Sequence, residues 1–378
     1  MSIPAFRPRS LAAALSLAAV GMPLSACDGG GTTGIGTPLT VSTTGRLERG
    51  STITLSVTSS GQPLAPGEYS LSVRPADAAQ VVDNTTVKLL RAGSVSITAT
   101  GSRKVGTAEL TVAAPPIVVF DRAVNGNRDI WKIDLDGQNL AQLTTDVGED
   151  QDPTVAKGTV VFVSYRSGNG DLWSVPLSGG ANTRLTTTLR DETTPALSPD
   201  GTKLAYAFLE SDVTKLYVAG ANAANPQRPA PTFGYDGSIE TWPSWASSSM
   251  LAFVSTNNGT ADIFELQGSA LPSLLAGGNT AEVEPAWSPD GQTLAFVSNR
   301  TGSVEIFLLR ISGGQVTQLT SGTGSKSQPA WTPDGRLVYV ETVSGTTRLR
   351  WLDPQQPGTT NLIDTGTGAV GHPATTAP

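Results

Sequence analysis

The sequence has one cysteine and one histidine among its 378 residues. A single cysteine excludes a disulfide framework within the chain and any zinc site built from cysteines. The single histidine, His372, makes a histidine-rich metal site or a Ser-His-Asp triad hard to assemble. Neither a glycine-rich phosphate loop nor a nucleophile elbow occurs in the sequence. Several common classes of enzyme are therefore disfavoured before any other motif is considered.

Charged residues are also scarce, at 15% of the chain, and aromatic residues make up only 6%. The formal net charge is −7 and basic residues do not cluster, so nucleic acid is not an expected partner. Glycine (41 residues) and proline (26 residues) are frequent, which disfavours long helices. The hydrophobic content of 38% is enough for packed cores, and the length predicts two domains.

The first 26 residues have the pattern of an export signal. Arg7 and Arg9 precede residues 11–24, an uncharged run that is rich in Leu and Ala. This run is too short to cross a bilayer as a helix, which needs about 20 residues. A positively charged start followed by a short apolar stretch instead predicts a signal peptide over residues 1–26.

The signal segment ends in Leu24-Ser25-Ala26-Cys27, which resembles the lipobox of bacterial lipoproteins. The resemblance implies that the Cys27 thiol carries diacylglycerol, that the peptide is cut before Cys27 and that the new amine is acylated. Two or more acyl chains would anchor the protein stably to a membrane. Residues 27–37 are rich in glycine and predict a flexible tether. An ordinary signal peptide with a chance cysteine is the alternative.

Residues 38–114 contain short runs with a period of two and no helical periodicity, which predicts an all-β sandwich. The predicted strands cover residues 39–42, 52–58, 69–73, 85–90, 94–100 and 108–112. The stretch from Arg91 to Gly101 is similar to the C-terminal signature of bacterial Ig-like domains of the second group. This resemblance implies an Ig-like domain that serves as a spacer or an adhesive module. Residues 113–116, Ala-Ala-Pro-Pro, predict a short, stiff linker.

From residue 117 to residue 378 the chain repeats itself. A Pro-x-x-x segment occurs six times, and the intervals between the prolines are 42, 48, 42, 44 and 44 residues. The prolines are Pro153, Pro195, Pro243, Pro285, Pro329 and Pro373. Apolar strands follow the first five segments, and the fourth element of a repeat often reads Leu-Thr. Four short strands at this period predict the blades of a six-bladed β-propeller.

The two ends of the repeat array indicate how the ring closes. The first repeat, which begins at Ile117, lacks its own Pro-x-x-x strand, whereas the last copy of that strand stands alone at residues 372–376. We therefore expect the C-terminal segment to supply the innermost strand of the blade formed by residues 117–144. Such closure removes exposed sheet edges.

The repeat sequence Pro-Ala-Trp-Ser-Pro-Asp-Gly, at residues 285–291, resembles the TolB-type propeller repeat. The resemblance extends over residues 117–378 and implies a fold more strongly than a function. Related propellers bind proteins, accompany peptidase domains or cleave sugars, and one fold hosts many functions. TolB itself is a soluble periplasmic protein of the Tol-Pal system with an α/β domain before its propeller. The role of TolB therefore does not transfer directly to a chain that starts with a lipobox and a β-sandwich.

Acidic residues recur three positions before the repeated prolines, at a point expected to ring the mouth of the central channel. The six residues at this position are Asp150, Glu192, Glu240, Glu282, Lys326 and Val370. Further acids stand beside them at Glu149, Asp152, Asp191 and Glu284. A mouth of one sign would favour a cation or a basic peptide. The alternative is that each acid only accepts backbone N–H bonds in its loop.

These observations favour a lipid-anchored, non-catalytic protein of the cell envelope. It would attach to the cell membrane or outer membrane through Cys27, on the periplasmic or surface side, and bind an envelope protein or peptide through the propeller face. A basic partner would suit the acidic mouth. No cofactor is required, although the acidic mouth would suit a divalent cation. Two alternatives stay open. One is a glycan-acting enzyme, a hydrolase or lyase, that uses paired carboxylates at the mouth, and the other is a purely structural surface protein.

Overall fold

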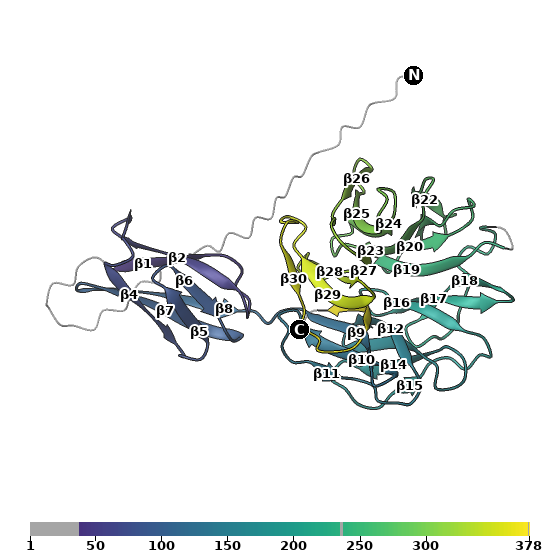
Figure 1. The fold of residues 1–378 in the computed structure, drawn as a ribbon, viewed down its shortest axis with the longest axis horizontal. Helices are drawn as coiled ribbons and strands as arrows, with labels where there is room; N and C mark the ends of the chain where they lie inside the picture. Colours follow the sequence, from purple (N-terminus) through teal and green to yellow (C-terminus); the bar gives the residue numbers. More distant parts are fainter. Residues whose placement is uncertain (1–37, 235–236, 377) are drawn as a thin grey trace, which may run out of the picture. The chain divides into compact units, whose positions relative to one another are not determined.

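The computed structural model describes residues 38–234, 237–376 and 378. The chain divides between Ala114 and Pro115 into two compact units, the sandwich unit (residues 38–114) and the propeller unit (residues 115–378). All regular elements of the described residues are β-strands (Figure 1). None of these residues forms a helix with the length and apolar character that a membrane span requires. The predicted signal peptide, Cys27 and the tether to residue 37 lie outside the described residues.

The sandwich unit consists of two antiparallel sheets. One sheet has the strand order β1-β2-β6-β5, with β3 paired to β2, and the other has the order β4-β7-β8. The strands are β1 (Leu39–Thr44), β2 (Thr52–Ser59), β3 (Gln62–Pro63), β4 (Tyr69–Arg74), β5 (Ala79–Asp83), β6 (Thr86–Leu89), β7 (Gly93–Gly101) and β8 (Lys104–Val112).

The two sheets of the sandwich unit share one core. Ile53 and Val87 from one sheet belong to the same buried cluster as Val95 and Ile97 from the other. Alternate side chains of β2 are buried and exposed, which is the period-two pattern seen in the sequence. All six predicted strands are present, whereas β3 and β5 were not predicted. The sequence did not reveal β5 because its two adjacent valines interrupt the alternation.

The propeller unit consists of six sheets, named blades 1 to 6 in chain order, that follow one another around a central axis (Figure 1). Blade 1 contains β9 (Ile117–Val124), β10 (Asn127–Asp134), β11 (Ala141–Gln142) and β31 (Val370–Thr376). Blade 2 contains β12 (Asp150–Ala156), β13 (Thr159–Ser164), β14 (Asp171–Pro176) and β15 (Thr183–Arg184). Blade 3 contains β16 (Glu192–Leu197), β17 (Lys203–Glu210) and β18 (Val213–Gly220). This architecture is the one that the repeats predict.

Blades 4 to 6 complete the ring. Blade 4 contains β19 (Glu240–Ser247), β20 (Met250–Ser255), β21 (Asp262–Gln267) and β22 (Ser273–Ala276). Blade 5 contains β23 (Glu282–Trp287), β24 (Thr293–Ser298), β25 (Glu305–Arg310) and β26 (Gln315–Gln318). Blade 6 contains β27 (Ser325–Trp331), β28 (Leu337–Val343), β29 (Thr346–Leu352) and β30 (Thr360–Leu362).

Blade 3 departs from the four-stranded pattern. A single antiparallel bridge between Val218 and Gln227 stands where a fourth strand would pair with β18. Pro226, Pro229 and Pro231 surround this bridge. Proline has no N–H to donate to a ladder, so this segment cannot continue as a regular edge strand.

The inner strand of each blade carries a β-bulge at its repeated proline. In blade 2, Gln151 pairs with Val163 and Thr154 with Val161, so Asp152 and Pro153 together oppose the single residue Phe162. The other five blades show the same register shift. The residues opposite the six bulges are all buried aromatic residues: Phe120, Phe162, Tyr206, Phe253, Phe296 and Tyr339. Proline suits a position where the ladder is interrupted, because it lacks the N–H that the ladder would use.

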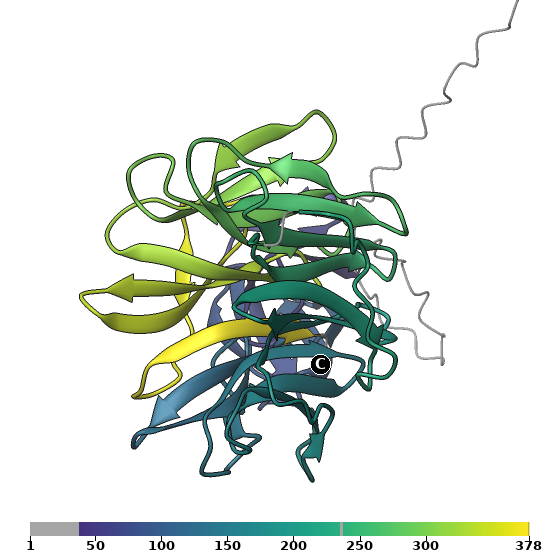
Figure 2. The same cartoon turned by 90° about the vertical axis from the view of Figure 1, so that its right-hand side faces the viewer.

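The C-terminal strand closes the ring, as the repeat array predicts. β31 pairs antiparallel with β9, with Ala374 opposite Val119 and Thr376 opposite Ile117. Figure 2 shows this strand, in yellow, beside the blue strands of blade 1. The core at this seam combines buried side chains of β9, β31 and blade 6, including Phe120 and Val338. The first and last blades are therefore joined by hydrogen bonds and by a shared core.

We predict that deleting residues 372–378 lowers the thermal unfolding midpoint of the propeller unit by about 5–10 °C. The deletion removes most of β31 and exposes part of the apolar side chains of β9, at a cost of about 3 kcal/mol or more. Differential scanning calorimetry of the full chain and the deletion variant measures the shift. Removing only residues 377 and 378, which follow β31, serves as the control and leaves the midpoint unchanged. An equal midpoint for both deletions would contradict this closure.

Candidate functional site

The five charged residues predicted to ring the channel mouth are buried at or next to the start of their inner strands. Asp150, Glu192 and Glu282 have no exposed surface, and Glu240 and Lys326 are 4% and 3% exposed. Asp150, Glu192, Glu240 and Glu282 are the first residues of β12, β16, β19 and β23, and Lys326 is the second residue of β27. The expectation that these side chains line the mouth is therefore wrong.

Each of these buried groups has polar partners within the propeller unit. Both carboxylate oxygens of Asp150 accept hydrogen bonds from the Arg166 guanidinium, at 3.0 and 2.8 Å. Glu282 accepts a hydrogen bond from Arg300 at 3.0 Å in the equivalent arrangement of blade 5. Lys326 donates to the Thr323 carbonyl at 2.7 Å. These groups are bound within the blades, and Asp150 and Glu282 pair with arginine side chains instead of the backbone N–H groups that the alternative expected.

Glu192 is held by neutral donors, whereas Glu240 also has two cations nearby, Arg228 and Lys215. The hydroxyls of Thr186 and Thr188 donate to Glu192, at 2.8 and 2.6 Å. The Leu216 N–H donates to Glu240 at 3.0 Å, and Arg228 lies 3.5 Å from the same carboxylate. Burial raises the pKa values of Asp150, Glu192 and Glu240, and these hydrogen bonds partly offset that effect.

A different set of residues lines the cavity at the propeller axis, which has a volume of about 130 Å³. These residues are the repeated prolines and the residue before each proline. The six pre-proline residues are Asp152, Thr194, Trp242, Glu284, Gln328 and His372. All six have a left-handed backbone conformation, with φ between 46° and 54°. We call them the axial ring.

The left-handed conformation explains why the predicted site lies two residues away from the observed one. Along a regular strand, side chains two residues apart share a face, so Asp150 and Asp152 would point the same way. The bulge breaks this alternation at Asp152, whose side chain lines the axial cavity while Asp150 stays buried against Arg166. Asp152 and Glu284 were two of the four adjacent acids noted in the sequence. They are the acids that the structure places on the axial ring.

Side chains of the axial ring also satisfy backbone N–H groups of the next blade. Glu284 accepts a hydrogen bond from the Gln328 N–H, and Gln328 Oε1 accepts one from the His372 N–H at 2.8 Å. The Asp152 carboxylate accepts a hydrogen bond from the backbone of Thr194. The bulge removes these N–H groups from the regular ladder, and a buried N–H without a partner is costly. Polar residues of the ring therefore stabilise the fold in addition to lining the cavity.

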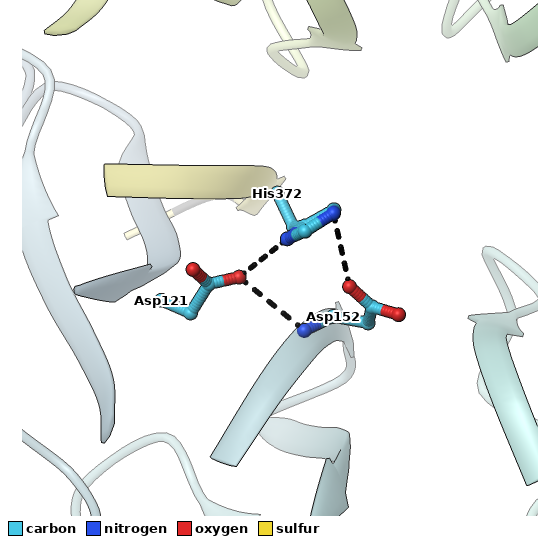
Figure 3. A group of neighbouring side chains, drawn as sticks. All are labelled: Asp121, Asp152 and His372. Carbon is cyan, nitrogen blue, oxygen red and sulfur yellow. Dashed lines mark hydrogen bonds and ion pairs between the residues drawn. The ribbon is translucent and has the colours of Figure 1, made fainter. Parts of the chain in front are cut away.

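Three residues from three strands meet at one side of the ring (Figure 3). Nδ1 of His372, on β31, lies 2.6 Å from Oδ2 of Asp121, on β9. Nε2 of the same ring lies 3.0 Å from Oδ1 of Asp152, on β12 of the next blade. The Asp152 N–H donates to Asp121 Oδ2 at 3.4 Å. This group, which we call the Asp-His-Asp cluster, links blades 1 and 2 beside the closing strand.

The cluster extends from a buried ion pair to the axial cavity. The side chain of Asp121 is fully buried and forms an ion pair with Arg128. The His372 side chain is 36% exposed and that of Asp152 is 12% exposed, so both reach the axial cavity. A Cβ added to Gly371 would lie 3.1 Å from Asp121 Oδ1, which shows how closely the closing strand approaches this carboxylate.

The charges of the cluster shift the pKa values of its members. Burial alone would lower the pKa of His372, but the hydrogen bond to Asp121 and the charges of Asp152, Asp121 and Glu284 raise it to about 9. Burial alone would raise the pKa of Asp121, but His372 and Arg128 outweigh it and lower that pKa. Burial raises the pKa values of Asp152 and Glu284. At neutral pH the imidazole is therefore a cation held between two carboxyl groups.

Sequence reasoning missed His372 and Asp121 as site residues. His372 was set aside because no second histidine accompanies it, and Asp121 lies inside an apolar strand with no motif around it. The position of His372 immediately before a repeated proline was the available signal, since every residue at that position lies on the axial ring. Asp121 is recognisable only after β31 is known to pair with β9.

We predict that the His372 imidazole titrates near pH 9 in the folded protein. Its pKa in the unfolded chain is about 6.5, so its contribution to stability is complete below about pH 6.5 and is lost as the pH rises through about 9. NMR can follow this titration without assignment because the chain has one histidine. The unfolding midpoint of a His372→Gln variant should change less than that of the parent protein between about pH 7 and pH 10. A histidine pKa near 6.5 would contradict this electrostatic environment.

Comparisons with known proteins agree with the architecture of the propeller unit. Residues 273–353 match the family model PD40, described as the TolB beta propeller domain. A Protein TolB homolog from Chlorobium luteolum (strain DSM 273 / BCRC 81028 / 2530) is 32% identical over 123 residues, which is 32% of this chain and 27% of the relative. A Protein TolB homolog from Chlorobium chlorochromatii (strain CaD3) is 31% identical over 184 residues, or 48% of this chain and 31% of the relative. The chain thus spans about a third of the length of these relatives.

A solved structure extends the likeness over a larger share of the chain. The crystal structure of TolB from Acinetobacter baumannii superimposes with a TM-score of 0.62 at 16% identity, covering 76% of this chain and 80% of the other. At this identity the match concerns the fold alone. Together with the sheet order and the closure by β31, these matches show that the chain contains a TolB-like β-propeller.

Proposed function

We propose that the protein is a lipid-anchored, non-catalytic binding protein of the cell envelope, whose axial cavity and surrounding loops hold a protein or peptide partner. The Leu24-Ser25-Ala26-Cys27 lipobox supports the anchor, and the likeness to TolB homologues supports a role in the cell envelope. Residues 38–114 then serve as an Ig-like stalk, with residues 27–37 as a tether between the lipid and the stalk.

The observation that carries the binding proposal is the variety of side chains on the axial ring. The six positions have the same backbone conformation, the same following proline and an aromatic residue opposite, yet they carry six different residue types. If folding alone decided the residue at this position, the blades would resemble one another here as they do at the aromatic position. The lining is instead asymmetric, with Trp242, two acids and a cation, and it suits recognition of one particular group of a partner.

Exposed apolar side chains in the loops before two inner strands support a protein partner. Val147 is 98% exposed and Leu189 is 93% exposed, and they lie in the loops directly before β12 and β16. The inner strands start from these loops and reach the axial ring two residues later, so both side chains stand at the end of the propeller where the ring lies. A partner that covers these loops while inserting a side chain into the cavity would bury apolar and polar surface together.

A glycan-acting enzyme receives less support from the geometry. A general acid and a general base need one protonated and one ionised carboxyl group, and burial shifts the pKa values of the two acids of the axial ring, Asp152 and Glu284, in the same direction. The cavity volume of about 130 Å³ is also small beside the roughly 300–1,000 Å³ of pockets that enclose small-molecule ligands. A single side chain or a chain terminus of a peptide fits this volume better.

The first experiment tests the anchor. We predict that a Cys27→Ser variant moves from the membrane fraction to the soluble fraction, because one hydroxyl replaces the thiol that carries the acyl chains. Fractionation of cells and labelling with a radioactive fatty acid measure this change. A Ser25→Ala variant, which keeps the cysteine, should remain labelled and membrane-bound. Equal labelling of the Cys27→Ser and Ser25→Ala variants would leave the lipoprotein proposal without support.

The second experiment tests the binding surface with the tagged full chain as bait in envelope extracts. A Trp242→Ala, Glu284→Gln variant alters the cavity, and a Val147→Ser, Leu189→Ser variant alters the loops. Each should reduce the amount of captured partner at least about tenfold, because buried anchors dominate binding energy. Leu271→Ser is the matched control, since Leu271 is 71% exposed in the β21–β22 hairpin, at the opposite end of the strands.

The outcomes separate the competing readings. A protein retained by the parent and the control, but lost by the cavity and loop variants, supports binding at the axial end of the propeller. Capture that is equal in all four forms would move the partner site elsewhere. If nothing is captured specifically by the parent, the purely structural role becomes the better description.

A further inference from the structure

The Asp-His-Asp cluster brings three groups together that are typical metal ligands. One nitrogen of His372 and one carboxylate oxygen each of Asp121 and Asp152 lie within 4.8 Å of one another. A zinc ion binds such atoms at about 2.0–2.2 Å, so its ligands lie about 3–3.5 Å apart. The three side chains would have to rotate to bring their ligand atoms to that spacing. The three residues belong to β9, β12 and β31, whose backbones pair or pack together at the ring closure.

One ligand atom of the cluster lacks a hydrogen bond. Asp152 Oδ1 is buried and accepts no hydrogen bond with acceptable geometry, although it lies 3.0 Å from His372 Nε2. In the metal-free protein this oxygen has the His372 imidazolium as an ion-pair partner but accepts no well-aligned hydrogen bond, whereas most buried polar oxygens accept one. A cation between Asp152 and His372 would satisfy this oxygen, and the axial cavity leaves room for a further ligand.

The donor set selects among metal ions. Calcium and magnesium prefer sites made of oxygen atoms, whereas imidazole suits zinc and its neighbours in the first transition row. Three protein ligands with a fourth position open to a cavity are the usual arrangement of a non-structural zinc site. We propose that Asp121, Asp152 and His372 bind one divalent first-row transition-metal ion, with a coordination position open to the axial cavity.

The charges around the cluster are compatible with such an ion. In the metal-free protein the imidazolium and Arg128 together balance Asp121 and Asp152. The ion replaces the proton on the coordinating nitrogen of His372, while Arg128 stays paired with the other oxygen of Asp121. Glu284, on the same ring, adds a negative charge that offsets the second charge of the ion. Binding would also tie β31 to blade 2, so it should stabilise the closed ring.

The proposal is tested by titrating Zn²⁺ into the purified, metal-stripped full chain without an affinity tag. We expect one equivalent to bind with micromolar or tighter affinity and, at saturation, to raise the unfolding midpoint by about 5 °C. Mg²⁺ and Ca²⁺ should neither compete nor stabilise. With Co²⁺ as the probe, visible absorption bands report coordination. His372 is the only imidazole of the chain, so its NMR signals should shift or broaden with the same stoichiometry.

Matched variants show whether these residues are the ligands. Asp152→Asn keeps the size of the side chain and leaves the closing strand intact, and it should weaken Zn²⁺ binding at least about tenfold. His372→Gln should weaken binding as strongly and remove the Co²⁺ bands. Glu284→Gln removes a nearby charge but no ligand, and its amide oxygen can still accept the Gln328 N–H, so it should weaken binding less than the ligand variants, by about threefold. Circular dichroism confirms that each variant is folded.

Three results would overturn the proposal: no saturable Zn²⁺ binding, equal binding by the parent and the Asp152→Asn variant, or displacement of Zn²⁺ by millimolar Ca²⁺. The titration requires no partner protein. The metal site and the proposed binding role can therefore fail independently of each other.

Discussion

The bulge at each repeated proline is the constraint on which the propeller unit depends. It inserts one extra residue into every inner strand, opposite a buried aromatic side chain, and turns the pre-proline residue toward the axis. Left-handed backbone at a residue other than glycine costs about 1 kcal/mol or more, and the chain accepts this cost six times. Without the bulge, regular alternation would direct every side chain of an inner strand toward a neighbouring blade, and none toward the axis.

The same device links the closure of the ring to the chemistry of its centre. β31 brings the sixth bulge to the first blade, and with it His372, so the Asp-His-Asp cluster exists only when the ends of the repeat array have met. The Asp121 side chain is fully buried there, and an unpaired carboxylate charge at this position would destabilise the fold. The imidazolium and Arg128 compensate this charge. The polar cluster therefore favours the correct pairing of β31 in addition to the apolar seam around Phe120.

The sequence predicted the fold well because its signals are periodic. Prolines recurring every 42 to 48 residues, apolar strands between them and an unmatched last repeat were enough to predict six blades and their closure. The site was harder to predict because a bulge changes side-chain direction without changing spacing. Asp150 and Asp152 stand two residues apart and look equivalent in the sequence, yet one pairs with Arg166 and the other lines the cavity. Only the pairing register separates them.

The acids of the propeller unit thus fall into two groups with different energetics. Asp150 and Glu282 each form an ion pair with an arginine of the same blade. Substituting either acid would therefore destabilise its blade and leave the binding surface unchanged. Asp152 and Glu284 reach the cavity and share the single cation His372. Burial raises the pKa values of both carboxyl groups, and a positive charge from outside would favour their ionised forms. A metal ion or a basic group of a partner would supply that charge, and the two would then compete for the same side of the axial ring.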